Sequence, residues 1–280
     1  MTGPASAAQR VLLYGESAAR VALRARIKNG VRDATERPVF VVGSPRSGTT
    51  FMAGCLGELP GFVDLGEVKP LKFSLRELPT LAEEDAARRL RRTLEQVRRL
   101  GLVRRLRAVE QTPETSFAVA AAQRAYPQGK VVVMIRDGRD VVCSLLAKRW
   151  FSDEPGRVDD VGLPYGAHAR PWVEPERVEE FERASEARRA AWAWRSYTLA
   201  ARRATAPAAL EVRYEELAAD PSAMAARIAA HVEADAEPLA RALSGVHADS
   251  VGRWRRDLTP EQLADVEAEA APLLRELDYP

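Results

Sequence analysis

The sequence has few cysteines, few histidines and few lysines, and each shortage narrows the range of functions. Two cysteines, Cys55 and Cys143, are too few for a disulfide framework. Only three histidines occur, and no cluster of Cys, His, Asp and Glu has metal-ligand spacing, so we expect no metal site. No uninterrupted apolar run is long enough to span a bilayer, and residues 1–9 lack the pattern of a secretory signal. We therefore expect a cytoplasmic protein without an integral membrane segment.

Charge and aromatic content argue against nucleic acid as a partner. The 42 basic residues, 37 of them Arg and 5 Lys, nearly balance 40 acidic residues, which leaves a net charge of +2. Aromatic residues make up 6% of the chain, without the interleaving of aromatic and basic side chains that favours RNA binding. Arg is well suited to phosphate and sulfate ligands, because its donors form a planar fork. The length of 280 residues allows one large α/β domain or two small ones.

The most informative motif is Gly43-Ser-Pro-Arg-Ser-Gly-Thr-Thr50, which follows the apolar run 39–42. Its two glycines have the spacing of the loop that binds nucleoside triphosphates, G-x-x-x-x-G-K-[ST]. Thr49 stands where that loop has its Lys, and the cation lies inside the loop at Arg46. A helix that begins near Thr49 would add free backbone N–H donors and a dipole that favours an anion. The motif therefore predicts a nucleotide-like anionic ligand and chemistry other than ATP hydrolysis.

Apolar periodicity predicts strands that alternate with helices along the chain. The strands are expected over residues 39–42, 108–110, 130–135 and 210–213. The helices are expected over residues 5–28, 49–59, 81–107, 114–126, 138–150 and 176–204, with a last helix that starts at residue 259. This alternation favours an α/β fold of P-loop-like, three-layer α/β/α type, with a central parallel sheet and extra helices. Residues 151–175 lack periodicity and are interpreted as a long loop of the kind that forms lids or binding segments.

Local signals refine the helices. Thr80-x-x-Glu83 and Thr259-Pro-Glu-Gln262 each have the spacing of a capping box at a helix start. The helix over 5–28 is basic and amphipathic, with apolar points from Val11 to Ile27. We expect it to pack on the domain, and attachment to a membrane or a partner is the alternative. The Arg-rich faces of residues 81–107 are expected to be solvated rather than to bind RNA.

A second segment, Val133 to Lys148, has the same predicted arrangement of strand, turn and helix as the first loop. Arg136 emerges where the strand ends, and Asp140, Ser144 and Lys148 are spaced by four residues, so they share one helix face. A cation at the strand end, a hydroxyl on the helix and a second cation can together bind one phosphate. Because ligands of parallel sheets lie beyond the carboxyl ends of the strands, both anion sites should face the same crevice. The alternative is a surface ion pair between Arg136 and Asp140.

These motifs, in this order, resemble the sulfotransferases that use 3′-phosphoadenosine-5′-phosphosulfate (PAPS). The resembling segments are Ser-Pro-Arg-Ser-Gly-Thr-Thr50, Leu-Gly-Glu67, Gln-Thr-Pro-Glu114, Ile-Arg-Asp-Gly-Arg-Asp-Val-Val-Cys-Ser144, Arg-Tyr-Glu-Glu216 and Gly-Arg-Trp-Arg255. The Gly-Glu pair and Arg-Asp-Gly-Arg are most similar to the tyrosylprotein and carbohydrate branch. The resemblance implies a single sulfotransferase domain over residues 1–280, with an N-terminal helical extension over 1–37 and a core over 38–275.

The resemblance also implies a nucleotide site without a metal. PAPS would be the cosubstrate and 3′,5′-adenosine bisphosphate (PAP) the product. The first loop would hold the 5′ end, the second segment the 3′-phosphate, and later residues would close over the nucleotide. The implied binding residues are Pro45, Arg46, Ser47, Gly48, Thr49, Thr50, Arg136, Ser144, Lys148, Tyr214, Arg253, Trp254 and Arg255. A purely structural role for Tyr214 in the core is the alternative at that position.

The implied catalytic residues are Arg46 and Glu67. Arg46 would stabilise charge that develops on the leaving oxygen, and Glu67 would be the general base. The alternatives are an ion pair of Glu67 with Lys69 or Lys72, and His168 as the base. The acceptor is expected to be a small molecule or glycan, such as a carbohydrate, a phenol or a secondary metabolite, that carries a hydroxyl or an amine. Its expected walls are residues 68–107 and 151–175 and nearby aromatic side chains, namely Trp150, Tyr165 and Trp172.

The sequence leaves two other functions open. One is a P-loop small-molecule kinase, which would need the loop Lys that Thr49 replaces and a partner for Mg²⁺. The other is a non-catalytic protein that binds a nucleotide or RNA. The sequence does not decide the oligomeric state, and a homodimer is one option.

Overall fold

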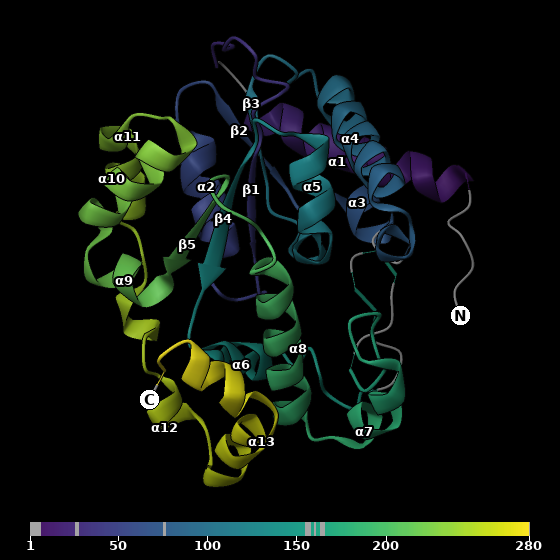
Figure 1. Cartoon of the computed structure of the whole chain (residues 1–280), viewed down its shortest axis with the longest axis vertical. Helices are drawn as coiled ribbons and strands as arrows, with labels where there is room; N and C mark the ends of the chain where they lie inside the picture. The colour runs from purple at the N-terminus through teal and green to yellow at the C-terminus, as the bar shows by residue number, and fades with distance from the viewer. Residues whose placement is uncertain are drawn as a thin grey trace.

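A parallel sheet of five strands forms the centre of the molecule (Figure 1). The computed structural model describes residues 7–25, 28–74, 77–154, 158–159, 161–162 and 166–279. The strands are β1 (Val39–Gly43), β2 (Phe62–Gly66), β3 (Arg107–Glu110), β4 (Lys130–Ile135) and β5 (Ala209–Arg213). Their order in the sheet is β2-β3-β1-β4-β5, and every pairing is parallel. The strand that leads into the first loop is therefore central, between β3 and β4.

Helices cover both faces of the sheet, as the alternating pattern predicts. Along β1, Phe40 and Val42 face one hydrophobic cluster, and Val39 and Val41 face the other. The first cluster is completed by α1 (Ala7–Arg24), α3 (Lys69–Ser74), α4 (Glu83–Leu100), α5 (Val119–Ala125), α6 (Gly138–Ala147), α7 (Val178–Arg183), α8 (Glu186–Ala201) and α13 (Pro260–Glu276). The second cluster is completed by α2 (Thr49–Glu58), α9 (Tyr214–Ala219), α10 (Pro221–Val232) and α11 (Ala236–Leu243). The three-layer α/β/α fold is confirmed.

The short elements lie between these helices and strands. One further helix, α12, covers Trp254–Asp257. Four 3₁₀ turns are η1 (Leu78–Thr80), η2 (Pro113–Ala118), η3 (Pro175–Arg177) and η4 (Ala248–Ser250). The turn η4 and the helix α12 lead the chain past the carboxyl end of β4 on its way to α13 (Figure 1).

Several element boundaries differ from the prediction. Strand β2 is missing from it, because a five-residue edge strand gives only a short apolar signal. The helix predicted over 81–107 ends at Leu100, and Gly101 is its C-cap. The helix predicted over 176–204 is divided into α7 and α8. Ser185 separates them, because its Oγ accepts a hydrogen bond of 3.1 Å from Arg188 N and caps α8.

One of the two predicted capping boxes is correct and the other is wrong. At the start of α13, Gln262 N donates to Thr259 Oγ1 (3.2 Å) and Thr259 N donates to Gln262 Oε1 (3.0 Å). At the start of α4, Ala82 is the N-cap and no side chain caps the helix. The Thr80 hydroxyl is used elsewhere, because it donates to the backbone oxygen of Glu77 (2.8 Å) within η1.

The N-terminal helix packs on the domain, as expected. Helix α1 contacts α3, α4 and β2, and its Val21 is fully buried in the first cluster. Val11 and Leu12 near the start of α1 and Leu23 near its end are exposed. Ile27 and residues 1–6 lie outside the described residues. Within the described part of the chain, none of the helices combines the length and hydropathy that a membrane span requires.

Candidate active site

The two glycines of the first loop permit a backbone that other residues would strain. Gly43 ends β1 with φ of 144°, and a Cβ there would lie 2.5 Å from the backbone oxygen of Met134 on β4. Gly48 is the N-cap of α2 with φ of 93°, and a Cβ there would lie 2.7 Å from the Tyr214 ring. Both positions combine positive φ with close packing, which explains why the loop has glycine at this spacing.

Arg46 extends from this loop toward α6. Its own φ is 72°, which is uncommon for a residue with a side chain. Its Nε donates a hydrogen bond of 2.9 Å to Ser144 Oγ, so the first loop and the second segment meet directly. Burial, together with the charge of Arg136, lowers the pKa of Arg46. The two guanidinium groups therefore lie close enough to repel each other.

Arg136 lies at the carboxyl end of β4 and is 6% exposed. Its Nη1 donates to the backbone oxygen of Arg46 (3.1 Å) and its Nη2 to that of Ser250 (2.7 Å). The guanidinium stacks on the Tyr214 ring at 4.4 Å, and Nε has no hydrogen-bond partner among the described residues. A buried donor without a partner costs free energy unless a ligand or water satisfies it. Arg136 is therefore held in place with hydrogen-bonding capacity to spare.

The alternative considered for Arg136, a surface ion pair with Asp140, does not form. The Asp140 carboxylate instead accepts hydrogen bonds from Gly252 N (2.7 Å) and Trp254 N (3.0 Å). Asp140 is fully buried, and burial raises its pKa. Asp140 thus fastens the segment that follows η4 to the start of α6.

A cavity of about 450 Å³ lies where these groups converge. Among the described residues, neither Arg46 nor Arg136 forms an ion pair with a carboxylate. The cavity thus has two cations without compensating acids, which favours an anionic ligand. It is lined by Arg46, Gly48, Thr49, Thr50, Phe51, Arg136, Ser144, Tyr214, His247, Ser250 and Arg253.

Tyr214 is both a core residue and part of the cavity wall. It is 5% exposed and belongs to the second hydrophobic cluster. Its ring also lines the cavity, where it packs against Gly48 and carries the Arg136 guanidinium. Its hydroxyl donates to the backbone oxygen of His247 (3.1 Å), so Tyr214 also links the cavity to the segment before η4.

Five predicted nucleotide contacts do not line this cavity. Pro45 is half-buried within the loop, and Ser47 is buried, with its N–H donating to the backbone oxygen of Ser44 (3.1 Å). Lys148 is exposed at the C-cap of α6, because that helix ends at Ala147. The Trp254 ring lies between the guanidinium groups of Arg139 and Arg255, at 4.0 and 4.6 Å.

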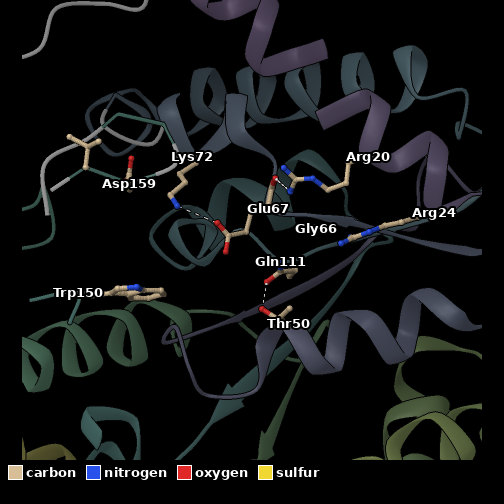
Figure 2. A pocket seen from close by; sticks show the side chains of 10 residues that line it. Arg20, Arg24, Thr50, Gly66, Glu67, Lys72, Gln111, Trp150 and Asp159 are labelled. Atoms are coloured by element: carbon tan, nitrogen blue, oxygen red, sulfur yellow. Dashed lines mark hydrogen bonds and ion pairs between the residues drawn. The ribbon is translucent and has the colours of Figure 1, made fainter. Parts of the chain in front are cut away.

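A second cavity, of about 530 Å³, contains Glu67 (Figure 2). Glu67 directly follows β2, and its side chain is 32% exposed. Lys72 Nζ donates to Glu67 Oε2 at 3.2 Å, which is one of the ion pairs considered above. Lys69 pairs with Glu16 instead (2.6 Å). This cavity is lined by Arg20, Arg24, Thr50, Gly66, Glu67, Lys72, Gln111, Trp150, Val158 and Asp159.

Thr50 lines both cavities, so they meet at the first turn of α2. Its Oγ1 donates to Gln111 Oε1 at 3.4 Å, as Figure 2 shows at the base of the second cavity. One side of Thr50 therefore faces the two unpaired arginines, and the other faces the cavity with the Glu67 carboxylate. The arrangement can bring an anionic donor and an acceptor together at one point.

Buried polar groups fix the backbone on either side of Glu67. Val68 N donates to Thr112 Oγ1 (2.8 Å), and Thr112 N donates to Glu110 Oε1 (2.7 Å). Glu110 ends β3 and is fully buried, which raises its pKa to about 7. On the other side, Arg20 Nη1 approaches the backbone oxygen of Glu67 at 3.4 Å. The direction of the Glu67 side chain is thus set by β2, β3 and α1 together.

The other predicted residues on the acceptor side have different positions. His168 is exposed and lines neither cavity. Trp172 packs against Phe151, Phe181 and Tyr197 rather than lining the cavity. Tyr165 lies outside the described residues. Trp150 does line the cavity, as do Val158 and Asp159 from the predicted loop 151–175.

Sequence reasoning missed Arg20, Arg24 and Gln111. Gln111 had a usable signal, because it opens the Gln-Thr-Pro-Glu114 segment that follows β3. The two arginines of α1 had none, since the contact between α1 and β2 joins distant parts of the chain. No group of three or more His, Cys, Asp or Glu side chains able to hold a metal occurs in the described part of the chain.

Comparison with known proteins identifies the family. The family model described as the sulfotransferase family matches residues 38–238. This chain belongs to the sulfotransferase family. The match covers both strand–turn–helix segments and Glu67, and it ends before Arg253. None of the curated proteins compared with this sulfotransferase matches it.

Solved structures of other sulfotransferases share the fold. Sulfotransferase STF9 from Mycobacterium avium has a TM-score of 0.53 and 14% identity, over 98% of this chain and 85% of that one. The sulfotransferase domain of the Synechococcus PCC 7002 olefin synthase has a TM-score of 0.50 and 17% identity, over 88% and 96% of the two chains. Mouse sulfotransferase SULT7A1, solved in complex with PAP, has a TM-score of 0.50 and 17% identity, over 88% and 86%. At these identities the comparison establishes a common fold.

Proposed function

We propose that this sulfotransferase transfers a sulfuryl group from PAPS to a hydroxyl or amine of a small-molecule or glycan acceptor. One observation carries the proposal. Arg46 and Arg136, from the two strand–turn–helix segments, meet at one cavity without a carboxylate partner in the described structure. Two fixed cations match a cosubstrate with separated anionic groups. The mouse relative that was solved with PAP supports the same choice.

The donor would be held by the ends of two adjacent strands. The 5′-phosphosulfate suits the N–H groups at the start of α2 together with Arg46, because helix N-termini favour anions. The 3′-phosphate suits Arg136, whose Nε is unpartnered, and Ser144 on α6. Arg253 lines the same cavity, and the segment held by Asp140 would form its outer edge.

The proposed reaction uses Glu67 as the base. An acceptor O–H proton passes to a Glu67 carboxylate oxygen while the acceptor oxygen forms a bond to sulfur. The bond between sulfur and the 5′-phosphate oxygen breaks, and PAP leaves with the electron pair. Arg46 and the N–H groups of the loop would stabilise the charge that develops on that oxygen. Lys72, at 3.2 Å from Glu67 Oε2, would keep the carboxylate oriented.

Calorimetric titration with three nucleotides tests the donor. PAP should bind more tightly than 5′-AMP or ATP with Mg²⁺, because only PAP offers both anionic groups of the spent donor. Arg136→Gln should weaken PAP binding by roughly tenfold to a hundredfold, the range for a hydrogen bond to a charged group. Its effect on 5′-AMP should be much smaller, since 5′-AMP lacks the 3′-phosphate.

Arg183→Gln is the matched control, because that side chain is 80% exposed on α7. Tighter binding of ATP with Mg²⁺ than of PAP would favour a kinase and overturn the proposal. Equal losses of PAP and 5′-AMP affinity in Arg136→Gln would overturn the assignment of the 3′-phosphate. Transfer of label from ³⁵S-PAPS to an acceptor then measures the reaction itself.

A further inference from the structure

The cavity that contains Glu67 has a wall of unusual origin. Arg20 and Arg24 are one turn apart on α1, so they project from the same face of that helix. Val21 anchors this part of α1 in the first hydrophobic cluster. In Figure 2 the two arginines lie on one side of the cavity, across from Trp150. The N-terminal helix therefore contributes charge to the space where an acceptor would bind.

Most charges around this cavity are already paired. Lys72 pairs with Glu67 at 3.2 Å, Arg24 with Asp64, and Asp159 with Arg170 at 2.9 Å. Arg170 also lies 4.0 Å from a carboxylate oxygen of Glu114, so each of these cations has at least one carboxylate beside it.

Arg20 is the exception. It forms no ion pair with any carboxylate in the described part of the chain. Its Nη1 donates a long hydrogen bond of 3.4 Å to the backbone oxygen of Glu67. A guanidinium has five N–H donors in a fixed fork, so most of the donors of Arg20 have no acceptor among the residues that the structure describes. One cation that lines a cavity with unused donors favours one negative charge on the ligand.

From this charge distribution we infer that the acceptor is a hydroxy acid, whose carboxylate binds Arg20 while its hydroxyl lies at Glu67. The inference rests on the proposed function, because it names the substrate class of the same site. A carboxylate fits better than a phosphate, because a single unpaired cation balances a monoanion and not a dianion. Trp150 on the far wall offers a ring face to the carbon skeleton of the acceptor.

The separation of the two groups supports one ligand that reaches both. Arg20 contacts the backbone of Glu67, and the Glu67 side chain extends from there toward Lys72 (Figure 2). A carboxylate on Arg20 would therefore lie about one side-chain length from the catalytic carboxylate. Negative charge on the acceptor would otherwise be repelled by Glu67, and the charge of Arg20 offsets that repulsion.

Three pairs of probes test the inference. Each pair is a hydroxy acid and its neutral amide: 4-hydroxyphenylacetate, glucuronate and 3-hydroxybutyrate with the corresponding amides. Initial rates with ³⁵S-PAPS give kcat and KM, and calorimetry on the same samples gives PAP affinity. We expect at least one acid to exceed its amide in kcat/KM by about tenfold to a hundredfold, the range for a charge-assisted hydrogen bond.

Arg20→Gln should remove this preference, mainly by raising KM for the acids, and should leave PAP affinity unchanged because Arg20 does not line the cavity with Arg46 and Arg136. Arg10→Gln is the matched control, because Arg10 is exposed on the same helix and lines neither of the two cavities. It removes the same charge and should retain the preference for the acid.

Three results would overturn the inference: amides used as well as acids, a preference that survives in Arg20→Gln, or no transfer to any of the three acids. PAP binding separates this failure from failure of the proposed function. A protein that binds PAP and sulfates the amides keeps the function and loses the inference. A protein that does not bind PAP loses both.

Discussion

The two cavities on either side of Thr50 treat charge in opposite ways. The cavity lined by Arg46 and Arg136, proposed to bind the donor, is called the donor cavity; within the described residues these two arginines have no acidic partner, and burial lowers the pKa of Arg46. The cavity that contains Glu67, proposed to bind the acceptor, is called the acceptor cavity, and there Lys72 is paired with the Glu67 carboxylate. The first arrangement suits a ligand that always carries negative charge. The second suits proton transfer, because Lys72 orients the Glu67 carboxylate and the carboxylate can still accept a proton from an acceptor.

The cavities also differ in how the chain builds them. The donor cavity uses two compact motifs at the ends of adjacent strands, β1 and β4, which are paired along the full length of β1. The acceptor cavity joins α1, the end of β2, the segment after β3 and the region after α6. The donor half is thus set by local sequence on a rigid sheet, and the acceptor half depends on long-range packing. Changes at the two cavities should therefore have different consequences.

The largest expected effect is the loss of the base. Glu67→Gln should lower kcat by about 10²–10⁴-fold, the usual contribution of general acid–base catalysis. PAP affinity should not change, because Glu67 does not line the donor cavity. Rates with ³⁵S-PAPS and calorimetry with PAP measure the two quantities. Glu16→Gln is the matched control, since Glu16 also pairs with a lysine of α3 but is 55% exposed. Full turnover in Glu67→Gln would remove Glu67 from the mechanism and with it the contrast between the cavities.

A smaller effect concerns stability and pH on the acceptor side. Burial raises the pKa of the Glu110 carboxyl from 4.5 to about 7. Between these values the unfolded state binds fewer protons than the folded state, so stability falls as pH rises from 4.5 to 7 and is constant above. Above pH 7, the raised pKa of the Glu110 carboxyl should lower the free energy of unfolding by up to about 3 kcal/mol. Glu110→Gln removes the titrating group and keeps an oxygen that can accept from Thr112 N.

Urea unfolding at pH 5 and pH 8 measures this effect. Relative to the wild type, Glu110→Gln should gain stability at the higher pH. Glu267→Gln, at an exposed site on α13, is the surface control. If the stability difference between Glu110→Gln and the wild type is the same at both pH values, the carboxyl does not titrate as described.

The smallest effect tests the rigidity of the donor side. Gly48→Ala places a side chain at φ of 93° and 2.7 Å from the Tyr214 ring. We expect a loss of about 1–2 kcal/mol from the backbone alone, and weaker PAP binding because Tyr214 carries the Arg136 guanidinium. Gly54→Ala in the same helix meets open space, and should gain about 0.5–1 kcal/mol. Thermal and urea unfolding distinguish the two, and equal behaviour would contradict the close packing at Gly48.

The sequence predicted the donor side well because its signals are local. An apolar run, a glycine spacing and an arginine at a strand end each occupy a few consecutive residues, and a parallel sheet aligns the ends of its strands. The meeting of Arg46 with Ser144 follows from that geometry. Lys148 shows where the logic fails. Its spacing from Ser144 is correct for one helix face, but α6 ends one residue before it.

The acceptor side was less predictable, since its signals depend on partners far along the chain. Strand β2 is short and lies at the edge of the sheet, where only pairing with β3 defines it. Trp172 was placed in the acceptor wall by proximity in sequence, yet aromatic neighbours hold it elsewhere. The same limit explains the capping boxes. Thr80 and Thr259 have equal spacing to their partners, and the hydroxyl of Thr80 finds a nearer acceptor.

Helix α1 and the two arginine-bearing loops lie in different parts of the chain. The stretch shared with the sulfotransferase family begins at residue 38, after α1 has ended. The part of the chain that matches the family model therefore includes Arg46 and Arg136 and does not include Arg20. A protein shortened to residues 38–238 would retain Arg46 and Arg136 and would lose the α1 side of the cavity that contains Glu67. In this sulfotransferase, the two proposed ligand sites would then depend on different stretches of one polypeptide.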